Sequence, residues 1–170
     1  MEIKLSVNGI EINVGIELIG QITSSLNDNE SNQAIFHELA QHSSSSVRKE
    51  VAYKDKISED TARILLADKD ISVINNLLRS DPVKEIFNDE DFSNILNSAN
   101  EEAIENVISN LDDYSSLSDA EDCLAQIIAL ENNYLTLQVA NNYDTPKKIL
   151  KKLVKHNDPD IAAAAKNSLD

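Results

Sequence analysis

The chain of 170 residues is long enough to bury the core of a globular domain, and its 41% hydrophobic content argues against wholesale disorder. Its 30 acidic and 15 basic side chains give a net charge of −15, which argues against general binding to nucleic acid or anionic membranes. The single cysteine excludes an internal disulfide and any site built from several cysteines. No apolar run approaches about 18 residues and no signal-peptide pattern is present, so we expect a soluble, cytoplasmic protein.

The start of the chain predicts a β-hairpin over residues 2–14. Apolar and polar residues alternate on both sides of Asn8-Gly9, a pair that favours a type I′ turn. Because an isolated hairpin is only marginally stable in water, its apolar face must pack on something. Two interpretations stay open: a cap on the first helices, or an edge that pairs with another chain. Residues 16–26 follow with apolar residues at helical spacing.

A sixteen-residue pattern recurs five times in the rest of the chain. Apolar residues with i, i+3, i+4 spacing are followed by six spacers and then by an apolar pair with i, i+4 spacing. The copies are Phe36, Leu39, Ala40, Val47, Val51; Ala62, Leu65, Leu66, Val73, Leu77; Phe92, Ile95, Leu96, Ala103, Val107; Leu124, Ile127, Ile128, Leu135, Val139; and Leu150, Leu153, Val154, Ile161, Ala165. This spacing places one apolar stripe on each of two helices joined by a tight turn.

Capping residues are in register with these stripes. The fourth spacer residue can cap the second helix of each copy, and it is Ser44, Asp70, Asn100, Asn132 and Asp158. Between copies we expect caps at Ser58, at Ser118 in a capping box with Glu121, and at Thr145 before Pro146. The longest connections leave room for an extra short helix near residues 82–87.

Two short helices cannot bury both of their apolar faces alone, so the copies must stack on one another. We therefore predict a mainly α fold: an α-solenoid of about five helical hairpins with a short N-terminal β-hairpin. Residues 1–30 would form the hairpin and a capping helix, and residues 31–170 the helical repeats, within a single compact unit.

The segment VANNYDTPKKILKKLVKHNDPDI, residues 139–161, resembles the leucine-rich repeat variant and the related HEAT-like bacterial α-helical repeats. LAQHSSSSVRKEVA, residues 39–52, and LLADKDISV, residues 65–73, are similar to the same family. Residues 92–107 depart most from it, and nothing in residues 1–30 resembles it. The resemblance implies a right-handed superhelix used as a binding scaffold, and no activity. The cysteine-bearing segment that holds an iron–sulfur cluster in one such protein type is absent, so we expect no cofactor.

Acidic side chains are concentrated in residues 85–146, which hold 14 of them and no lysine or arginine. Because successive connections of a solenoid align along one edge, we expect an acidic stripe there. The residues in the two long connections are Glu85, Asp89, Glu90, Asp91, Asp112, Asp113, Asp119, Glu121 and Asp122. One interpretation is that acids favour helix N-termini and keep the protein soluble. The other is a docking surface for a basic protein, or a mimic of nucleic-acid phosphates, that weakens at high salt.

A lysine-rich face follows this segment at Lys147, Lys148, Lys151, Lys152 and Lys155. It is interpreted as the solvated face of a helix. A phosphate or nucleic-acid contact, or head-to-tail association with the acidic stripe, are the alternatives.

No combination of residues predicts catalysis. His42 and His156 occupy the same position in different copies, so they cannot share a site, and His37 is expected at the surface near the end of its helix. Cys123 lies beside an apolar stripe and is interpreted as a small core residue. We find no phosphate-binding loop and no metal motif, so we expect no catalytic, metal or cofactor site.

The sequence thus predicts a non-enzymatic protein–protein interaction scaffold whose acidic residues 85–146 dock a basic partner protein. It predicts no direct contact with nucleic acid or membrane. The alternative is an inhibitor that mimics nucleic acid, and a third hypothesis is a HEAT-like enzyme that acts on nucleic acid. The third needs a basic concave face, which only residues 147–155 could supply. A monomer and a homodimer through the N-terminal hairpin both stay open.

Overall fold

A computed structural model describes residues 3–169 of the chain. This part is mainly helical, with twelve α-helices, two 3₁₀-helices and two β-strands. None of its helices has the length and apolar character needed to span a membrane. The chain divides into two compact units, residues 1–86 and 87–170. The boundary that the sequence predicts after residue 30 stays a prediction. The predicted hairpin begins at residue 2 and the predicted domains begin at residue 1 and end at residue 170, and these three residues lie outside the described part of the chain.

The first unit begins with two strands, β1 (Lys4–Val7) and β2 (Ile10–Asn13), which pair antiparallel. The residues between them, Asn8 and Gly9, have φ values of 52° and 78°, the left-handed conformation that a two-residue turn requires. The side chains of β2 are all exposed, including the apolar Ile10 and Ile12. Ile10 and Ile12 are therefore largely accessible to water, and both interpretations of the hairpin stay predictions.

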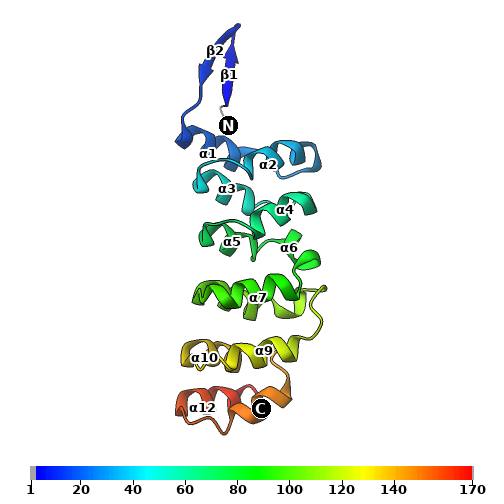
Figure 1. The fold of residues 1–170 in the computed structure, drawn as a ribbon, viewed down its shortest axis with the longest axis vertical. Helices are drawn as coiled ribbons and strands as arrows, with labels where there is room; N and C mark the ends of the chain where they lie inside the picture. Colours follow the sequence, from blue (N-terminus) through cyan, green and yellow to red (C-terminus); the bar gives the residue numbers. More distant parts are fainter. Residues whose placement is uncertain (1–2, 170) are drawn as a thin grey trace. The chain divides into compact units, whose positions relative to one another are not determined.

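Helices make up the rest of the first unit. They are α1 (Ile16–Ser25), η1 (Glu30–Asn32), α2 (Gln33–Leu39), α3 (Ser45–Ala52), α4 (Glu59–Leu66), α5 (Ile71–Leu77) and α6 (Asp81–Ile86). One row is formed by α1, α3 and α5, and a second row by α2, α4 and α6 (Figure 1). The short helix expected near residues 82–87 is α6, so this prediction is confirmed.

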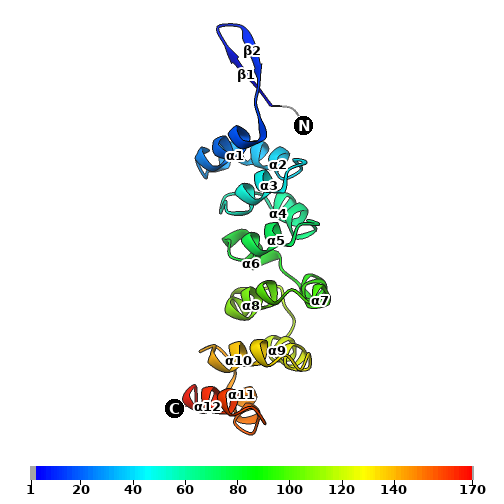
Figure 2. The same cartoon turned by 90° about the vertical axis from the view of Figure 1, so that its left-hand side faces the viewer.

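The second unit repeats this arrangement of helix pairs. Its elements are α7 (Asp89–Ser98), α8 (Glu101–Ser109), η2 (Leu111–Asp113), α9 (Ala120–Ile128), α10 (Asn133–Asn141), α11 (Lys147–Leu153) and α12 (Pro159–Asn167). One row contains α8, α10 and α12, while α9 packs on α11 (Figure 2). Each row buries the apolar stripe of one helix against the next.

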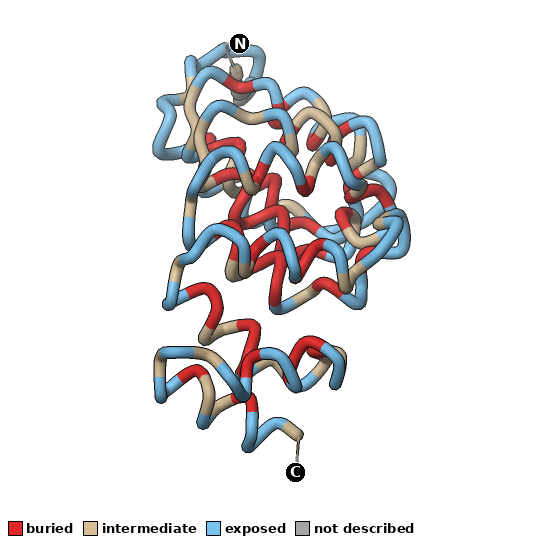
Figure 3. The backbone as a smooth tube through the Cα atoms, turned by 60° about the horizontal axis from the view of Figure 1, so that its bottom comes forward, coloured by how far each residue is buried: buried red, intermediate tan, exposed pale blue. Residues whose placement is uncertain are grey.

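The predicted apolar stripes form the cores of both units. Of the 25 repeat positions, 21 are buried, and the buried stretches of the backbone lie on the sides that face neighbouring helices (Figure 3). Burial is weakest at the last residue of the triplet, where Val154 is 36% exposed. The repeated spacing therefore identified the core residues correctly.

The predicted column of caps is largely confirmed. Four of its five side chains accept a hydrogen bond from a backbone N–H of the following helix: Asp70, Asn100, Asn132 and Asp158. Ser44 also precedes its helix, but its hydroxyl is hydrogen-bonded to that of Ser46 instead. Ser58 caps α4 as expected, accepting from the N–H of Thr61.

Two predicted caps between copies are wrong. The cap of α9 is Asp119 rather than Ser118, because a carboxylate accepts backbone N–H groups more strongly than a hydroxyl does. Thr145 does not cap α11, since its hydroxyl donates to the carbonyl of Val139 at 2.7 Å. Pro146 then lies just before the helix, which begins at Lys147.

In four of the five copies, the turn holds a second hydrogen bond that the sequence did not predict. A side chain there accepts the N–H of the residue two positions later, and the accepting residues are His42, Asp68, Ser98 and His156. The two histidines therefore act as turn acceptors through Nδ1.

A buried ion pair links two copies in the first unit. The Arg48 guanidinium donates two hydrogen bonds to the carboxylate of Asp68, one of them at 2.8 Å, and a third to the carbonyl of His42, also at 2.8 Å. Burial would raise the pKa of Asp68, but the hydrogen bonds from Arg48 and from the N–H of Asp70 outweigh it and lower this pKa. The pair thus ties α3 to the turn after α4.

We predict that the imidazole of His42 titrates below its ordinary pKa of 6.5, because burial and the neighbouring Arg48 charge disfavour the imidazolium. The folded state then binds this proton less readily than the unfolded state. His42 therefore contributes stability that is present above pH 6.5 and is lost as the pH falls through the folded pKa. Following the imidazole by NMR between pH 4 and 8 measures this pKa, and a value above 6.5 would contradict the assignment.

We predict that Leu135→Ala in α10 lowers the free energy of unfolding of the second unit by about 2–5 kcal/mol, since this side chain is fully buried. Leu130→Ala is the matched control, because Leu130 is 42% exposed and should change stability by about 0.5 kcal/mol or less. Urea unfolding followed by circular dichroism measures both. Equal losses in the two variants would show that the stripes do not form the core.

Candidate docking site

Several predicted docking residues hold the ends of helices in place. Asp89, at the start of α7, accepts hydrogen bonds from the N–H and the hydroxyl of Ser118, and so joins this end of α7 to the segment before α9. Asp91 forms a capping box with Asn88, and Asp119 caps α9. These carboxylates stabilise helix N-termini, as the first interpretation of the acidic stripe expects.

The other acids near the start of α9 also have local partners. Glu121 is paired with Lys148 of α11 at 2.6 Å, and Asp122 accepts a hydrogen bond from Gln126 at 2.8 Å. Glu90 is exposed in the first turn of α7, whereas Glu85 lies in α6 of the first unit. The nine acidic residues predicted to form one docking surface therefore lie in different local environments. Some stabilise helix N-termini, Glu121 is ion-paired, and Glu85 belongs to the first unit.

A different environment surrounds Asp112 and Asp113. Both are exposed in η2, and Asp144 lies near them in the loop before α11. Burial and the negative charges of Asp144 and Asp113 raise the pKa of Asp112. Burial is the largest of these causes, and the charges of Asp144 and Asp113 add to it. Within residues 3–169, no group of three or more histidine, cysteine, aspartate or glutamate residues is placed to hold a metal ion.

An aromatic ring accompanies these carboxylates. Tyr143 is 91% exposed, and its pKa is raised by a hydrogen bond to Asp144 and by the charges of Asp144, Asp113 and Asp112. The loop that carries it is fixed by Asn142, which donates to the carbonyl of Ile108 and accepts from the N–H of Asp144. We call Asp112, Asp113, Tyr143 and Asp144 the acidic–aromatic site.

A hollow of about 250 Å³ lies beside Tyr143. Its lining is mostly amide and hydroxyl groups, with Ile108 as its aliphatic side chain. The acidic–aromatic site thus combines a flat exposed ring, three carboxylates and a polar recess. Guanidinium and ammonium groups bind carboxylates and stack on tyrosine rings, so the site has the chemistry to hold basic side chains.

Sequence analysis identified half of this site. It selected Asp112 and Asp113, but it counted Asp144 only as part of the acidic segment and did not select Tyr143. The repeat register contained the missing signal: Asp112 lies five residues after Val107, and Asp144 lies five residues after Val139. Equivalent positions in adjacent copies of a stack lie close together, so this spacing predicts the cluster.

The remaining candidate residues have structural surroundings. Cys123 is buried in α9, and burial together with the charges of Asp89, Asp122 and Asp119 raises its pKa to about 11. His37 is hydrogen-bonded to the hydroxyl of Thr61 at 3.2 Å. The lysine-rich face is exposed on and just after α11, where Lys148 contacts Glu121.

Comparison of the chain with family models, with curated proteins and with solved structures found no match. The resemblance of residues 139–161 to helical repeat families stays a prediction.

We predict that iodoacetamide alkylates Cys123 on the order of a hundredfold more slowly than a free cysteine at pH 8, because so little thiolate forms at a pKa of about 11. As the chain has one cysteine, mass spectrometry gives the rate directly. Alkylation in urea provides the control and should be as fast as that of the free amino acid. A native rate near this control would contradict the buried environment.

Proposed function

We propose that the protein is a non-enzymatic interaction module, an α-solenoid of helical hairpins, that docks a basic segment of a partner protein at its acidic–aromatic site. The repeated apolar stripes and the rows of helices within each unit support the solenoid. The proximity of Asp112, Asp113 and Asp144 to the exposed ring of Tyr143 is the observation that supports the docking function most strongly.

The N-caps of α9 and α11 are Asp119 and Pro146, so Asp112, Asp113 and Asp144 are not the N-caps of these helices. Asp89, Asp91 and Asp119 stabilise the N-termini of α-helices, so their charge has a structural purpose. Asp112 and Asp113 lie in a 3₁₀-helix instead, and Asp144 lies in a loop. The charges of Asp144 and Asp113 contribute to the raised pKa of Asp112, and a bound cation would offset them.

Arginine is the side chain that best fits the acidic–aromatic site. Its planar guanidinium can form paired hydrogen bonds with a carboxylate while it stacks on an aromatic ring, whereas lysine presents a single compact charge. Tyrosine and arginine are also enriched among the residues that contribute most to protein–protein binding. We therefore expect the partner to present one or more arginines, and the binding to weaken as salt screens the carboxylates.

The first test measures binding of an arginine-rich peptide by calorimetry. We predict that Tyr143→Ala and the double variant Asp112→Asn/Asp144→Asn each weaken binding by about fivefold or more, because both remove contacts to the guanidinium groups. Tyr53→Ala and Asp60→Asn are matched controls, since they remove an exposed tyrosine and an exposed acid from the first unit.

The controls should change affinity by less than about twofold. Equal losses in all variants would mean that the peptide responds to net charge alone, which would contradict a defined site. A lysine-rich peptide of equal charge should bind more weakly than the arginine-rich one.

The nucleic-acid mimic remains the alternative proposal. In that case the partner would be a protein that binds DNA or RNA, and this protein would occupy its nucleic-acid-binding surface. A partner captured from cells through the acidic–aromatic site would then be released by duplex DNA in competition. Release by an arginine-rich peptide but not by DNA supports docking of a basic protein segment.

A further inference from the structure

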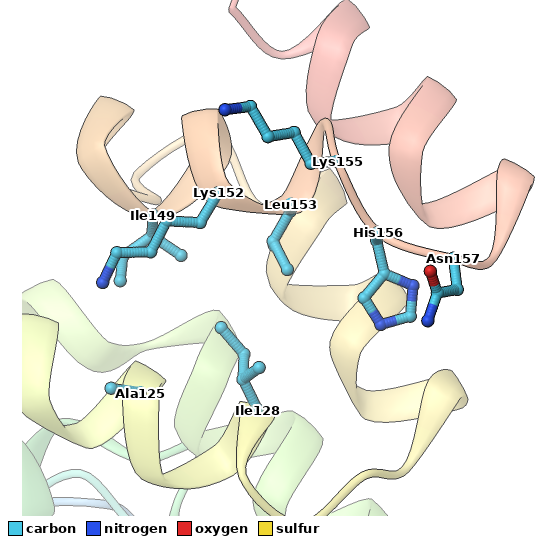
Figure 4. Close-up of a pocket in the computed structure, with 8 residues that line it drawn as sticks. All are labelled: Ala125, Ile128, Ile149, Lys152, Leu153, Lys155, His156 and Asn157. Carbon is cyan, nitrogen blue, oxygen red and sulfur yellow. The ribbon is translucent and has the colours of Figure 1, made fainter.

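A groove of about 420 Å³ lies between α9 and α11, both in the second unit. Its walls are apolar: Ile149 and Leu153 point from α11 toward Ala125 and Ile128 of α9 (Figure 4). The volume is within the range of clefts that bind small molecules, about 300–1,000 Å³. None of its lining residues belongs to the acidic–aromatic site, so it is a separate feature.

The charged groups of the groove are lysines, and its other polar side chains, His156 and Asn157, can each donate a hydrogen bond. Lys152 lies beside Ile149, and His156 closes the other end (Figure 4). His156 Nδ1 accepts the N–H of Asp158 at 3.1 Å, so the neutral ring carries its proton on Nε2, which can donate. Among the described residues that line the groove there is no aspartate or glutamate.

This charge pattern is opposite to that of most of the second unit. Residues 85–146 hold 14 acids and no lysine or arginine, yet the groove has Lys152 and Lys155 among its lining residues. An apolar channel with cationic and N–H donors at its edge is complementary to a hydrocarbon chain that carries one negative charge.

We propose that the groove binds a small aliphatic carboxylate. The hydrocarbon chain would lie against Ala125, Ile128, Ile149 and Leu153, where it leaves water. The carboxylate would accept hydrogen bonds from Lys152 and from His156. This inference does not depend on the proposed docking function, because it uses other residues and another class of ligand.

The test is a calorimetric titration of the full chain with decanoate. We expect saturable binding of one decanoate per chain, and a loss of affinity of about two- to fivefold in Lys152→Gln, as for an exposed charge pair. Lys151→Gln is the matched control, because Lys151 is an exposed neighbour on α11 that does not line the groove. It should bind decanoate as the unaltered chain does.

A second pair of variants tests the apolar walls. Ala125→Trp should fill the groove and abolish binding, whereas Ala129→Trp places the same ring at an exposed position outside it. Circular dichroism checks that both variants keep their helices, and Tyr143→Ala should leave decanoate binding unchanged. The proposal is overturned if decanoate does not saturate, if decyltrimethylammonium binds equally well, or if Ala125→Trp binds normally.

Discussion

The structure depends on one constraint: its helices are too short to be stable alone. Most have seven to ten residues, and isolated helices of this length do not persist in water. Each must bury its apolar stripe against a neighbour, as α3 does between α1 and α5, and α10 between α8 and α12. This burial fixes the register of adjacent copies. Side chains at equivalent positions in their connections are therefore brought together, although about thirty residues separate them in the sequence.

The same constraint separates two kinds of acidic residue. Those at the starts of α7 and α9 satisfy backbone N–H groups that would otherwise lack partners, so they are part of how short helices end. Asp112 and Asp113 lie in η2 instead, and Asp144 lies in the loop before α11. They lie close together in the second unit, and burial together with the charges of Asp144 and Asp113 raises the pKa of Asp112.

Much of this architecture could be predicted from the sequence, because it follows from local spacing. The stripes and most of the caps were identified, since an apolar period and a capping residue are set by a few neighbouring positions. The errors have a different origin. Ser118 and Thr145 were expected to cap helices, but they bind Asp89 and the carbonyl of Val139, which local spacing did not indicate. Tyr143 was missed because two of the carboxylates near it, Asp112 and Asp113, come from another copy.

The central claim is that basic side chains bind one defined site rather than the acidic surface in general. Mapping of backbone amide shifts by NMR, as an arginine-rich peptide is added, tests it most directly because every part of the chain is observed at once. The account predicts that the largest shifts cluster at residues 111–114 and 142–145. Shifts of similar size at the starts of α7 and α9, or spread evenly over residues 85–146, would contradict it.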